Sequence, residues 1–298
     1  MAPEIHPQAE VHPTAVLGKR VRVGAGTRVG AHAVIEDDVV LGERNVIWPT
    51  AFVGRYTTLG DENQVHPGAV IGHLPQDLSF DPSWVSFTRI GHRNTFREHS
   101  QVHRGSREGA ETVIGDDNLF MALTHVAHDC VVGNRVVLVN QASLPGHCQV
   151  ADRVLMSGFT GIHQFCRIGR LAMISALSVS NKDLPPFFVY GGRPALAEGV
   201  NRVGLRRAGV SREARAEIKT AYRLLYASGL TIPEALERME AELRSPEVAE
   251  LVDFVRKSKR GIAFGSKAAA DTLSTKRHRA EVRLPRPSGG DGRAPRAP

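Results

Sequence analysis

The chain has 298 residues, of which 42% are hydrophobic and 23% charged, as expected for a globular protein that buries a sizeable core. No apolar run approaches the ~20 residues needed to cross a bilayer, and the acidic, proline-containing N-terminus does not resemble a signal peptide. Three cysteines, an odd number, argue against a disulfide framework and favour the reducing cytoplasm.

The net charge of +7 would suit a nucleic-acid or membrane-surface partner if it were spread over the chain. Most of it lies in residues 267–298, which hold eight Lys or Arg against three acids and leave only +2 for residues 1–266. This segment is also rich in Pro, Gly and Ser and poor in large apolar residues. We therefore expect a disordered basic tail and no nucleic-acid partner.

An apolar residue recurs at every sixth position in two long runs, and only Glu108 breaks the pattern within a run. The first run is Ile5, Val11, Leu17, Val23, Val29, Ile35, Leu41, Ile47, Val53, Leu59, Val65 and Ile71. The second is Ile90, Phe96, Val102, Glu108, Ile114, Phe120, Val126, Val132, Leu138, Leu144, Val150, Met156, Ile162, Ile168 and Ile174. This period is neither the 2 of a single long strand nor the 3.6 of a helix.

Two further columns accompany the repeat. Glycine often follows the apolar residue, where we expect it to supply backbone angles that other residues avoid. A small residue often stands four places after the apolar one. The hexads predict a mainly β protein, a left-handed parallel β-helix over residues 1–186 in which three hexads close one triangular coil and each coil packs on its neighbours. Inserted loops are expected at about 72–89 and 105–112, where the phase shifts or Glu108 intervenes.

The three cysteines fit this repeat. Cys130, Cys148 and Cys166 are eighteen residues apart, one coil each, and all occupy the small inward position. We expect a buried column of small hydrophobic side chains rather than a metal site, because no histidine or acid shares the column.

Helical signals follow the last hexads. Ser211 can cap a helix that ends at Gly229, Thr231 to Glu234 form a capping box, and Ser245-Pro246 can begin another helix. These signals predict a small helical domain over residues 187–266.

Histidines cluster in one part of the repeat. His125, His128 and Asp129 lie within five residues, and His147 and His163 follow one and two coils later. Stacked coils can bring these imidazoles to one surface, where a histidine would suit general-base catalysis. Unremarkable surface histidines are the alternative. A zinc site like that of the gamma-class carbonic anhydrases is a third reading, but the pair here has the wrong spacing, so we expect no metal.

From His125 to Asn134, HVAHDCVVGN, the sequence resembles the acyl carrier protein-dependent UDP-N-acetylglucosamine O-acyltransferases that begin lipid A synthesis. The resemblance covers nearly residues 1–262. Further matching motifs are PQDL at 75–78, IGHRNTFRE at 90–98, VHRG at 102–105, GDDNLFM at 115–121, LPGH at 144–147, HQFC at 163–166, DLPP at 183–186 and GVNRVGLRRAG at 199–209. Proteins of this family are homotrimers with active sites between neighbouring β-helices.

The resemblance implies roles for individual residues. His128 matches the general base, Asp129 the acid that supports it, and Gly146 the backbone N–H that steadies the oxyanion. Neighbours on a strand point to opposite faces, so Asp129 can assist only if a corner turns it. The groups expected to hold the sugar nucleotide or the acyl donor are Asp77, His125, His147, His163, Gln164, Asn201 and Arg207. The implied reaction uses acyl carrier protein as donor and needs no cofactor.

In this family a small inward-facing position closes the acyl pocket, and Ala176 occupies it here, which implies a donor of medium length.

Three positions depart from the family pattern: Ser79 replaces a lysine, Val203 a glutamate and Ala208 an arginine, all among residues expected near the nucleotide. A paralogous enzyme for another nucleotide sugar, such as a 3-amino analogue, therefore stays open, as does a non-catalytic trimeric scaffold.

Overall fold

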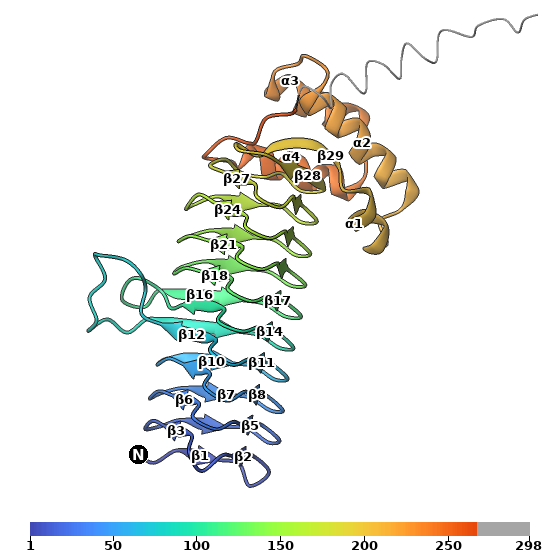
Figure 1. Cartoon of the computed structure of the whole chain (residues 1–298). Coiled ribbons are helices and arrows are strands. Elements are labelled where there is room, and N and C mark those ends of the chain that lie inside the picture. Colours follow the sequence, from blue (N-terminus) through green and yellow to red (C-terminus); the bar gives the residue numbers. More distant parts are fainter. Residues whose placement is uncertain (267–298) are drawn as a thin grey trace, which may run out of the picture.

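The structure is a computed structural model that describes residues 1–266, and the expected basic tail at 267–298 lies outside the described residues. The chain winds into a column of stacked coils whose strands form three long parallel sheets, with helices gathered at the end opposite the N-terminus (Figure 1). We call the sheets A, B and C after β1, β2 and β3. Among the described residues, no helix has the length and apolar character needed to span a bilayer.

Each sheet takes every third strand of the chain. Sheet A contains β1 (Glu4–Ile5), β4 (Arg22–Val23), β7 (Val40–Leu41), β10 (Thr57–Leu59), β13 (Phe87–Ile90), β16 (Glu111–Ile114), β19 (Val131–Val132), β22 (Gln149–Val150) and β25 (Arg167–Ile168). Sheet B contains β2 (Glu10–Val11), β5 (Arg28–Val29), β8 (Val46–Ile47), β11 (Gln64–Val65), β14 (Thr95–Phe96), β17 (Leu119–Phe120), β20 (Val137–Leu138), β23 (Leu155–Met156), β26 (Met173–Ile174), β28 (Phe188–Gly191) and β29 (Leu196–Val200). Sheet C contains β3 (Val16–Leu17), β6 (Val34–Ile35), β9 (Phe52–Val53), β12 (Val70–His73), β15 (Gln101–His103), β18 (His125–Val126), β21 (Ser143–Leu144), β24 (Gly161–Ile162) and β27 (Val179–Ser180).

The hexad residues form the core of the column. Ile35, Leu41 and Ile47, one from each sheet of a single coil, are all buried. Regular coils pair residues eighteen apart, as Phe52 does with Val70. The predicted parallel β-helix is therefore confirmed, because apolar side chains that point inward can be buried only by the coils above and below.

The structure explains the glycines of the repeat by a different cause from the backbone angles expected from the sequence. Positive φ falls mainly on non-glycine corner residues, such as Asp38 at 61° and Asp117 at 60°. Gly30 and Gly42, which follow hexad residues, are not among the positive-φ glycines. A Cβ on Gly30 would lie 2.6 Å from the Pro49 nitrogen, and one on Gly42 2.6 Å from the Gly60 oxygen. Close approach between coils, rather than backbone angle, requires glycine there.

A ladder of buried asparagines follows one inner corner. Each Oδ1 accepts a hydrogen bond from the backbone N–H at the equivalent position of the next coil, at 2.7 to 3.0 Å. The rungs are Asn45, Asn63, Asn94 and Asn118, all at the small inward position. The cysteines form the predicted column at an equivalent position, since Cys130, Cys148 and Cys166 are all buried and free.

Two loops leave the corner between sheets C and A. Val70 pairs with Gln101, thirteen residues beyond the regular eighteen, and Gln101 pairs with His125, six beyond it. The loops therefore span residues 74–86 and 104–110, and they project from one side of the column (Figure 1). They are also joined: the Val85 N–H donates to Glu108 at 2.7 Å, and the Gly109 N–H donates to the Val85 oxygen at 2.8 Å.

The segment after the last coil is only partly helical. The expectation of a helical unit starting at 187 is wrong for residues 188–200, because β28 pairs with β26 and forms an antiparallel hairpin with β29. This hairpin continues sheet B at the end of the column. The helices are α1 (Arg202–Arg207), α2 (Arg212–Tyr226), α3 (Ile232–Glu242) and α4 (Pro246–Arg256). Ser211 caps α2 and the Thr231/Glu234 capping box begins α3, as predicted.

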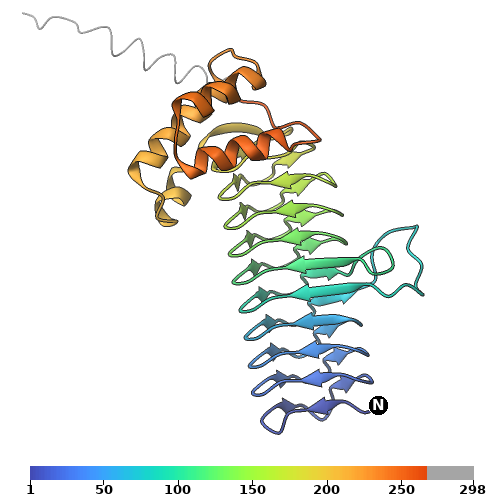
Figure 2. The same ribbon diagram turned by 180° about the vertical axis from the view of Figure 1, so that it is seen from behind.

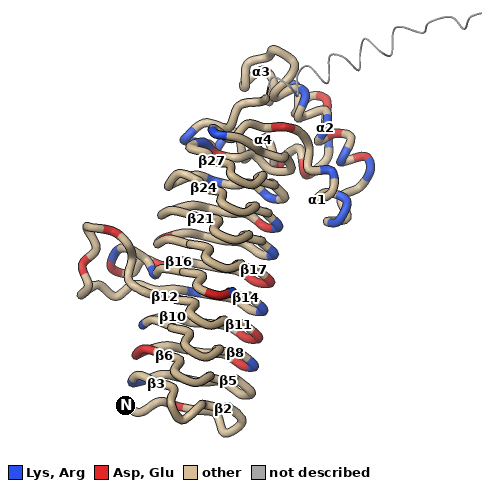
Figure 3. The backbone as a smooth tube through the Cα atoms, viewed as in Figure 1, with Lys and Arg blue, Asp and Glu red and all other residues tan. Residues whose placement is uncertain are grey.

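The charged residues among 1–266 lie mostly on corners and on the helices (Figure 3). Arg20 pairs with Asp38, and Arg93 with Asp117, each linking two successive coils. These exposed pairs contribute little to stability individually, with a typical magnitude of about 0.2–1 kcal/mol. Their positions show that the corners, unlike the column interior, accept charge.

Candidate active site

The corner between sheets C and A brings several of the predicted site residues together. In successive coils, the residues after β18, β21 and β24 stack: His128 with Gly146 and Gln164, and Asp129 with His147 and Phe165. The rings of His128 and His147 lie 5.2 Å apart in a T-shaped arrangement, and His147 stacks on Phe165 at 4.6 Å. The eighteen-residue period thus builds one cluster from separate hexads.

His128 and Asp129 form a hydrogen-bonded dyad. Asp129 has φ 58°, so the corner turns its side chain back toward that of its neighbour. The Nδ1 of His128 lies 2.7 Å from Asp129 Oδ2, and both side chains are only 12% exposed. The corner therefore turns Asp129 toward His128, as the sequence required if Asp129 is to assist that histidine. With Nδ1–H donating to the carboxylate, Nε2 of His128 is left as the basic nitrogen.

Asp129 receives further hydrogen bonds from the loop 104–110. The Ser106 hydroxyl donates to Oδ2 at 2.6 Å, and the Ser106 N–H lies 3.2 and 3.3 Å from the two carboxylate oxygens. Burial alone would raise the pKa of Asp129, but the hydrogen bonds from His128 and Ser106 outweigh it and leave the pKa lowered. Asp129 is thus kept ionised beside His128. Sequence reasoning missed Ser106, whose only signal was its place in the interrupted hexad.

Gly146 lies directly against the His128 ring. A Cβ at this position would stand 2.5 Å from His128 Cε1 and 2.8 Å from Nε2, so any larger residue would displace the imidazole. Within residues 1–266 the Gly146 N–H donates no hydrogen bond. Gly146 therefore offers an unused backbone donor in the residue that packs on the His128 ring, and such a donor can stabilise a developing oxyanion.

The same cluster is also the one candidate metal site that the described residues offer. One ligand atom each from His128, Asp129 and His147 lies within 4.8 Å of the others. However, Oδ2 of Asp129 already accepts hydrogen bonds from His128 and Ser106. A metal ion bound here would have to take Oδ2 of Asp129 away from both hydrogen bonds, so the hydrogen-bonded dyad describes these residues better.

His125 lies beside the cluster in a drier environment. Its ring is 5.1 Å from that of His103, and its Nδ1 lies 3.3 Å from Gln101 Oε1. Burial, and then the neighbouring imidazoles of His103 and His128, lower the pKa of His125 to about 4. His125 is therefore neutral at physiological pH and suited to hydrogen bonding. Sequence reasoning also missed His103, whose Nδ1 donates to the Leu74 oxygen at 2.6 Å and anchors the loop 74–86.

Asp77 reaches toward the cluster on the loop 74–86. Ser79 donates to its Oδ1 through both the backbone N–H and the hydroxyl, each at 2.9 Å. These hydrogen bonds, with a smaller attraction from His128, lower the pKa of Asp77. Ser79, which stands where the family has lysine, thus orders the Asp77 carboxylate locally.

The remaining predicted site residues lie further from the His128–Asp129 dyad. His163 and Gln164 are exposed one coil beyond Gly146, and His163 Nδ1 donates to the Gln164 oxygen at 3.0 Å. Asn201 caps α1 and donates to the Leu171 oxygen at 2.8 Å, and Arg207 is exposed in the same helix. Figures 1 and 2 show α1 on the side of the column opposite the projecting loops, so one chain does not join these groups to the dyad.

The expectation that Ala176 faces inward is wrong. It is exposed on the corner between sheets B and C, because the small inward position after Ile174 falls on the buried Ser178, two residues later. Three large apolar side chains on the same corner are more than half exposed: Leu123, Phe159 and Leu177. Of the other departures from the family pattern, Val203 is exposed in α1 and Ala208 is its C-cap residue.

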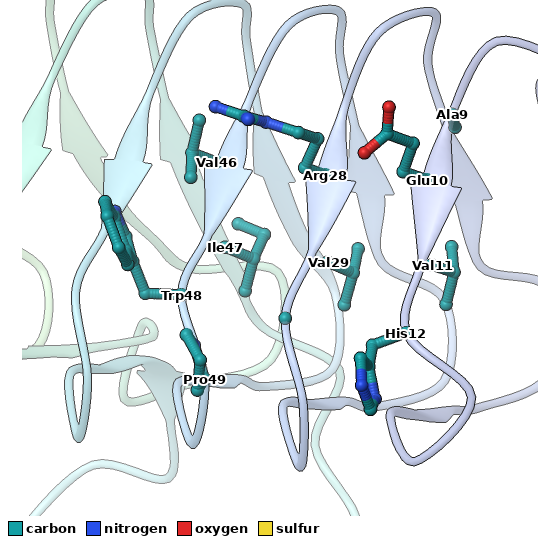
Figure 4. Close-up of a pocket in the computed structure, with 11 residues that line it drawn as sticks. Ala9, Glu10, Val11, His12, Arg28, Val29, Val46, Ile47, Trp48 and Pro49 are labelled. Carbon is teal, nitrogen blue, oxygen red and sulfur yellow. The ribbon is translucent and has the colours of Figure 1, made fainter.

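A separate groove of about 640 Å³ lies on the N-terminal coils (Figure 4). Side chains of β2, β5 and β8 line it, together with the corner residues His12, Trp48 and Pro49. None of the predicted site residues does. The candidate site is thus the corner cluster and not this groove.

Comparison with known proteins agrees with this geometry. Residues 183–263 match a family model described as domain 2 of UDP-N-acetylglucosamine O-acyltransferase. An acyl-[acyl-carrier-protein]–UDP-N-acetylglucosamine O-acyltransferase of Synechocystis sp. (strain ATCC 27184 / PCC 6803 / Kazusa) is 42% identical over 204 residues, which cover 68% of this chain and 73% of the relative. The protein of that name from Verminephrobacter eiseniae is 44% identical over 202 residues, covering 67% and 77%.

Solved structures agree over a larger share of the chain. A UDP-N-acetylglucosamine acyltransferase from Campylobacter jejuni superposes with a TM-score of 0.74 at 31% identity, covering 88% of this chain and all of that one. The enzyme from Bacteroides fragilis gives 0.69 at 36%, covering 86% and 98%. With this identity, this coverage and the same β-helix, the chain belongs to the UDP-N-acetylglucosamine O-acyltransferase family.

Proposed function

We propose that this protein transfers a 3-hydroxyacyl chain from acyl carrier protein to the 3-hydroxyl of UDP-N-acetylglucosamine, the first step of lipid A biosynthesis. The observation that carries the proposal is the His128–Asp129 dyad packed against the Gly146 backbone. The relatives named for this reaction share about two-fifths of their aligned residues with this chain.

The geometry supports a direct transfer. His128 Nε2 removes the proton from the sugar 3-hydroxyl, while Asp129 stabilises the imidazolium that forms. The resulting alkoxide attacks the thioester carbonyl, and the negative charge that develops on its oxygen meets the Gly146 N–H. The C–S bond then breaks, and His128 returns its proton to the phosphopantetheine thiolate. Every proton is accounted for without a metal, a cofactor or a covalent enzyme intermediate.

We propose further that the complete site forms between neighbouring chains of a homotrimer. Asn201 and Arg207 lie across the column from the dyad, and the exposed apolar corner at Leu123, Phe159 and Leu177 lies on a different edge from His128. A neighbouring chain could bring these groups to the dyad, with His163 and Gln164 beside them. Ala176, on that apolar corner, would then limit the acyl chain from within the groove between chains.

We place the reaction in the cytoplasm. The three cysteines are free thiols, and thiols persist best in a reducing compartment.

Turnover with defined substrates tests the proposal. Purified protein is incubated with 3-hydroxyacyl carrier proteins and either UDP-N-acetylglucosamine or its 3-amino analogue, and the products are identified by mass spectrometry. Ester formation on UDP-N-acetylglucosamine is expected. Exclusive amide formation on the amino analogue would replace the acceptor, and no product with any nucleotide sugar would contradict the activity.

A further inference from the structure

Ser106 is the point at which the shorter loop meets the dyad. It leaves the regular coil with the extra hexad of residues 104–110, yet only 4% of it is exposed. Its hydroxyl is 2.6 Å from Asp129 Oδ2, the oxygen that also accepts from His128 at 2.7 Å. Three donors therefore converge on one carboxylate: the imidazole, the serine hydroxyl and the serine N–H.

The loop that carries Ser106 is held on both sides. The Gly105 N–H donates to the Phe87 oxygen at 3.2 Å, and the Gly109 N–H to the Val85 oxygen at 2.8 Å. Glu108 accepts from the Val85 N–H at 2.7 Å. The hydroxyl is thus presented to Asp129 by a fixed backbone rather than by a free surface loop.

Other corner aspartates of this chain are held differently. Asp38, on the same corner as Asp129, and Asp117, on another, share its left-handed backbone, but each is bound by an arginine from the preceding coil. A guanidinium would neutralise the carboxylate and compete with an imidazolium for it. Ser106 orients Asp129 with neutral donors and leaves its charge available to His128.

The orientation of the Asp129 carboxylate matters because a second imidazole lies near it. His147 Nε2 lies 3.7 Å from Asp129 Oδ2, so a modest rotation of the carboxylate would bring it to His147 instead of His128. The Ser106 hydroxyl and N–H, binding from the side of the loop, oppose that rotation.

We propose that Ser106 is a positioning residue: it holds the Asp129 carboxylate against His128 Nδ1, so that His128 rather than His147 acts as the base. This inference rests on the proposed role of His128. It also gives the broken hexad a role, because a regular corner places Arg20 against Asp38, whereas the insertion places Ser106 against Asp129.

The test compares Ser106→Ala with Ser106→Thr, which keeps a hydroxyl, and Ser106→Cys, which keeps the volume with a weak donor. We expect Ser106→Ala to lower kcat by about 10- to 100-fold, the range for one hydrogen bond to a charged group, with KM for both substrates changed little. Ser106→Thr should restore most of the loss, and Ser106→Cys should fall between. Ser100→Ala is the matched control, because Ser100 is a buried serine whose hydroxyl has no partner within residues 1–266.

A double-mutant cycle separates positioning from simple packing. In an Asp129→Ala background, Ser106→Ala should cause little further loss of kcat, because its effect acts through the missing carboxylate. An equal loss in both backgrounds, or a Ser106→Ala kcat within twofold of wild type, would overturn the proposal. If Ser106→Ala does not fold, a wild-type kcat for Ser106→Cys overturns it instead. Wild-type turnover and His128→Ala are measured alongside, so failure of the proposed function is seen separately.

Discussion

At the scale of single residues, the site depends on a corner that reverses a side chain. Asp129 and His128 are adjacent in sequence and would diverge on a flat strand, but the left-handed φ of 58° lets them meet at 2.7 Å. Gly146 then permits the closest approach of backbone to imidazole, since a Cβ would overlap the ring. The proposed base, its supporting acid and the proposed oxyanion donor thus occupy two consecutive turns of the same corner.

His128→Ala should remove most activity while leaving the fold intact. The side chain is largely covered but lies on a corner outside the hexad core, so its loss leaves the packing of that core unchanged. Loss of an acid–base group typically lowers kcat by about 10²- to 10⁴-fold. Steady-state turnover, together with circular dichroism and sedimentation to check the fold, measures this, and near-normal turnover by a folded variant would contradict the assignment.

Ala176 provides a second test at this scale. If it ends the acyl groove between chains, Ala176→Gly should shift the preferred donor to a longer chain and Ala176→Met to a shorter one. An extra methylene that has no room costs roughly 1–3 kcal/mol, more than the ~0.8 kcal/mol that its burial contributes. Competition among carrier-protein donors of stepped acyl length measures the preferred chain length of each variant. Unchanged preference in both variants would mean that the groove ends at another residue.

At the scale of elements, the hexads predicted the column, and they also predicted where it is interrupted. Periodicity could not show what the interruptions carry, because hydrogen bonds that the hexads do not specify hold the two loops, such as His103 to the Leu74 oxygen and Ser106 to Asp129. The hairpin β28–β29 was missed because its residues have no hexad, and only pairing with β26 makes it a strand. The corner cluster could be predicted because successive coils stack. The outward direction of Ala176 could not, because it depends on which positions of the hexad form the corner.

The asparagine ladder gives a prediction for the column itself. Asn63 donates to Asn45 Oδ1 and the Gly91 oxygen and accepts from the Asn94 N–H, all in the buried interior. Asn63→Ala would leave buried groups unsatisfied, so we expect destabilisation of about 2–4 kcal/mol. Asn134→Ala is the control, because Asn134 makes similar bonds on an exposed corner. Thermal unfolding compares the two, and equal melting temperatures would show that the ladder adds no stability.

At the scale of the whole molecule, the proposed homotrimer would bring together groups that a single chain holds apart. The dyad and the projecting loops face one way, while α1 lies on the opposite side of the column (Figures 1 and 2). A closed ring of three copies would place α1 of each chain near the dyad of the next, which is how heterologous interfaces share a site.

Mixing two inactive variants tests this arrangement. His128→Ala and Arg207→Glu chains, unfolded and refolded together, should regain activity, because about a quarter of randomly assorted sites would pair an intact dyad with an intact α1. Refolding His128→Ala with Asp129→Ala is the control, since every dyad then keeps one defect. Absence of recovery in the first mixture, with mixed trimers demonstrated by differential tagging, would place both residues in the same chain's site.

The positions of the two loops also indicate which changes in chain length this fold can tolerate. Thirteen extra residues lie between β12 and β13 and six between β15 and β16, yet the coils on either side stay in alignment because both insertions leave from a corner. A deletion of one residue within a coil would instead turn the inward side chains of its remaining strands outward, or force the chain to bulge. Relatives should therefore tolerate long insertions at corners and whole added coils more readily than the loss of a single residue between them.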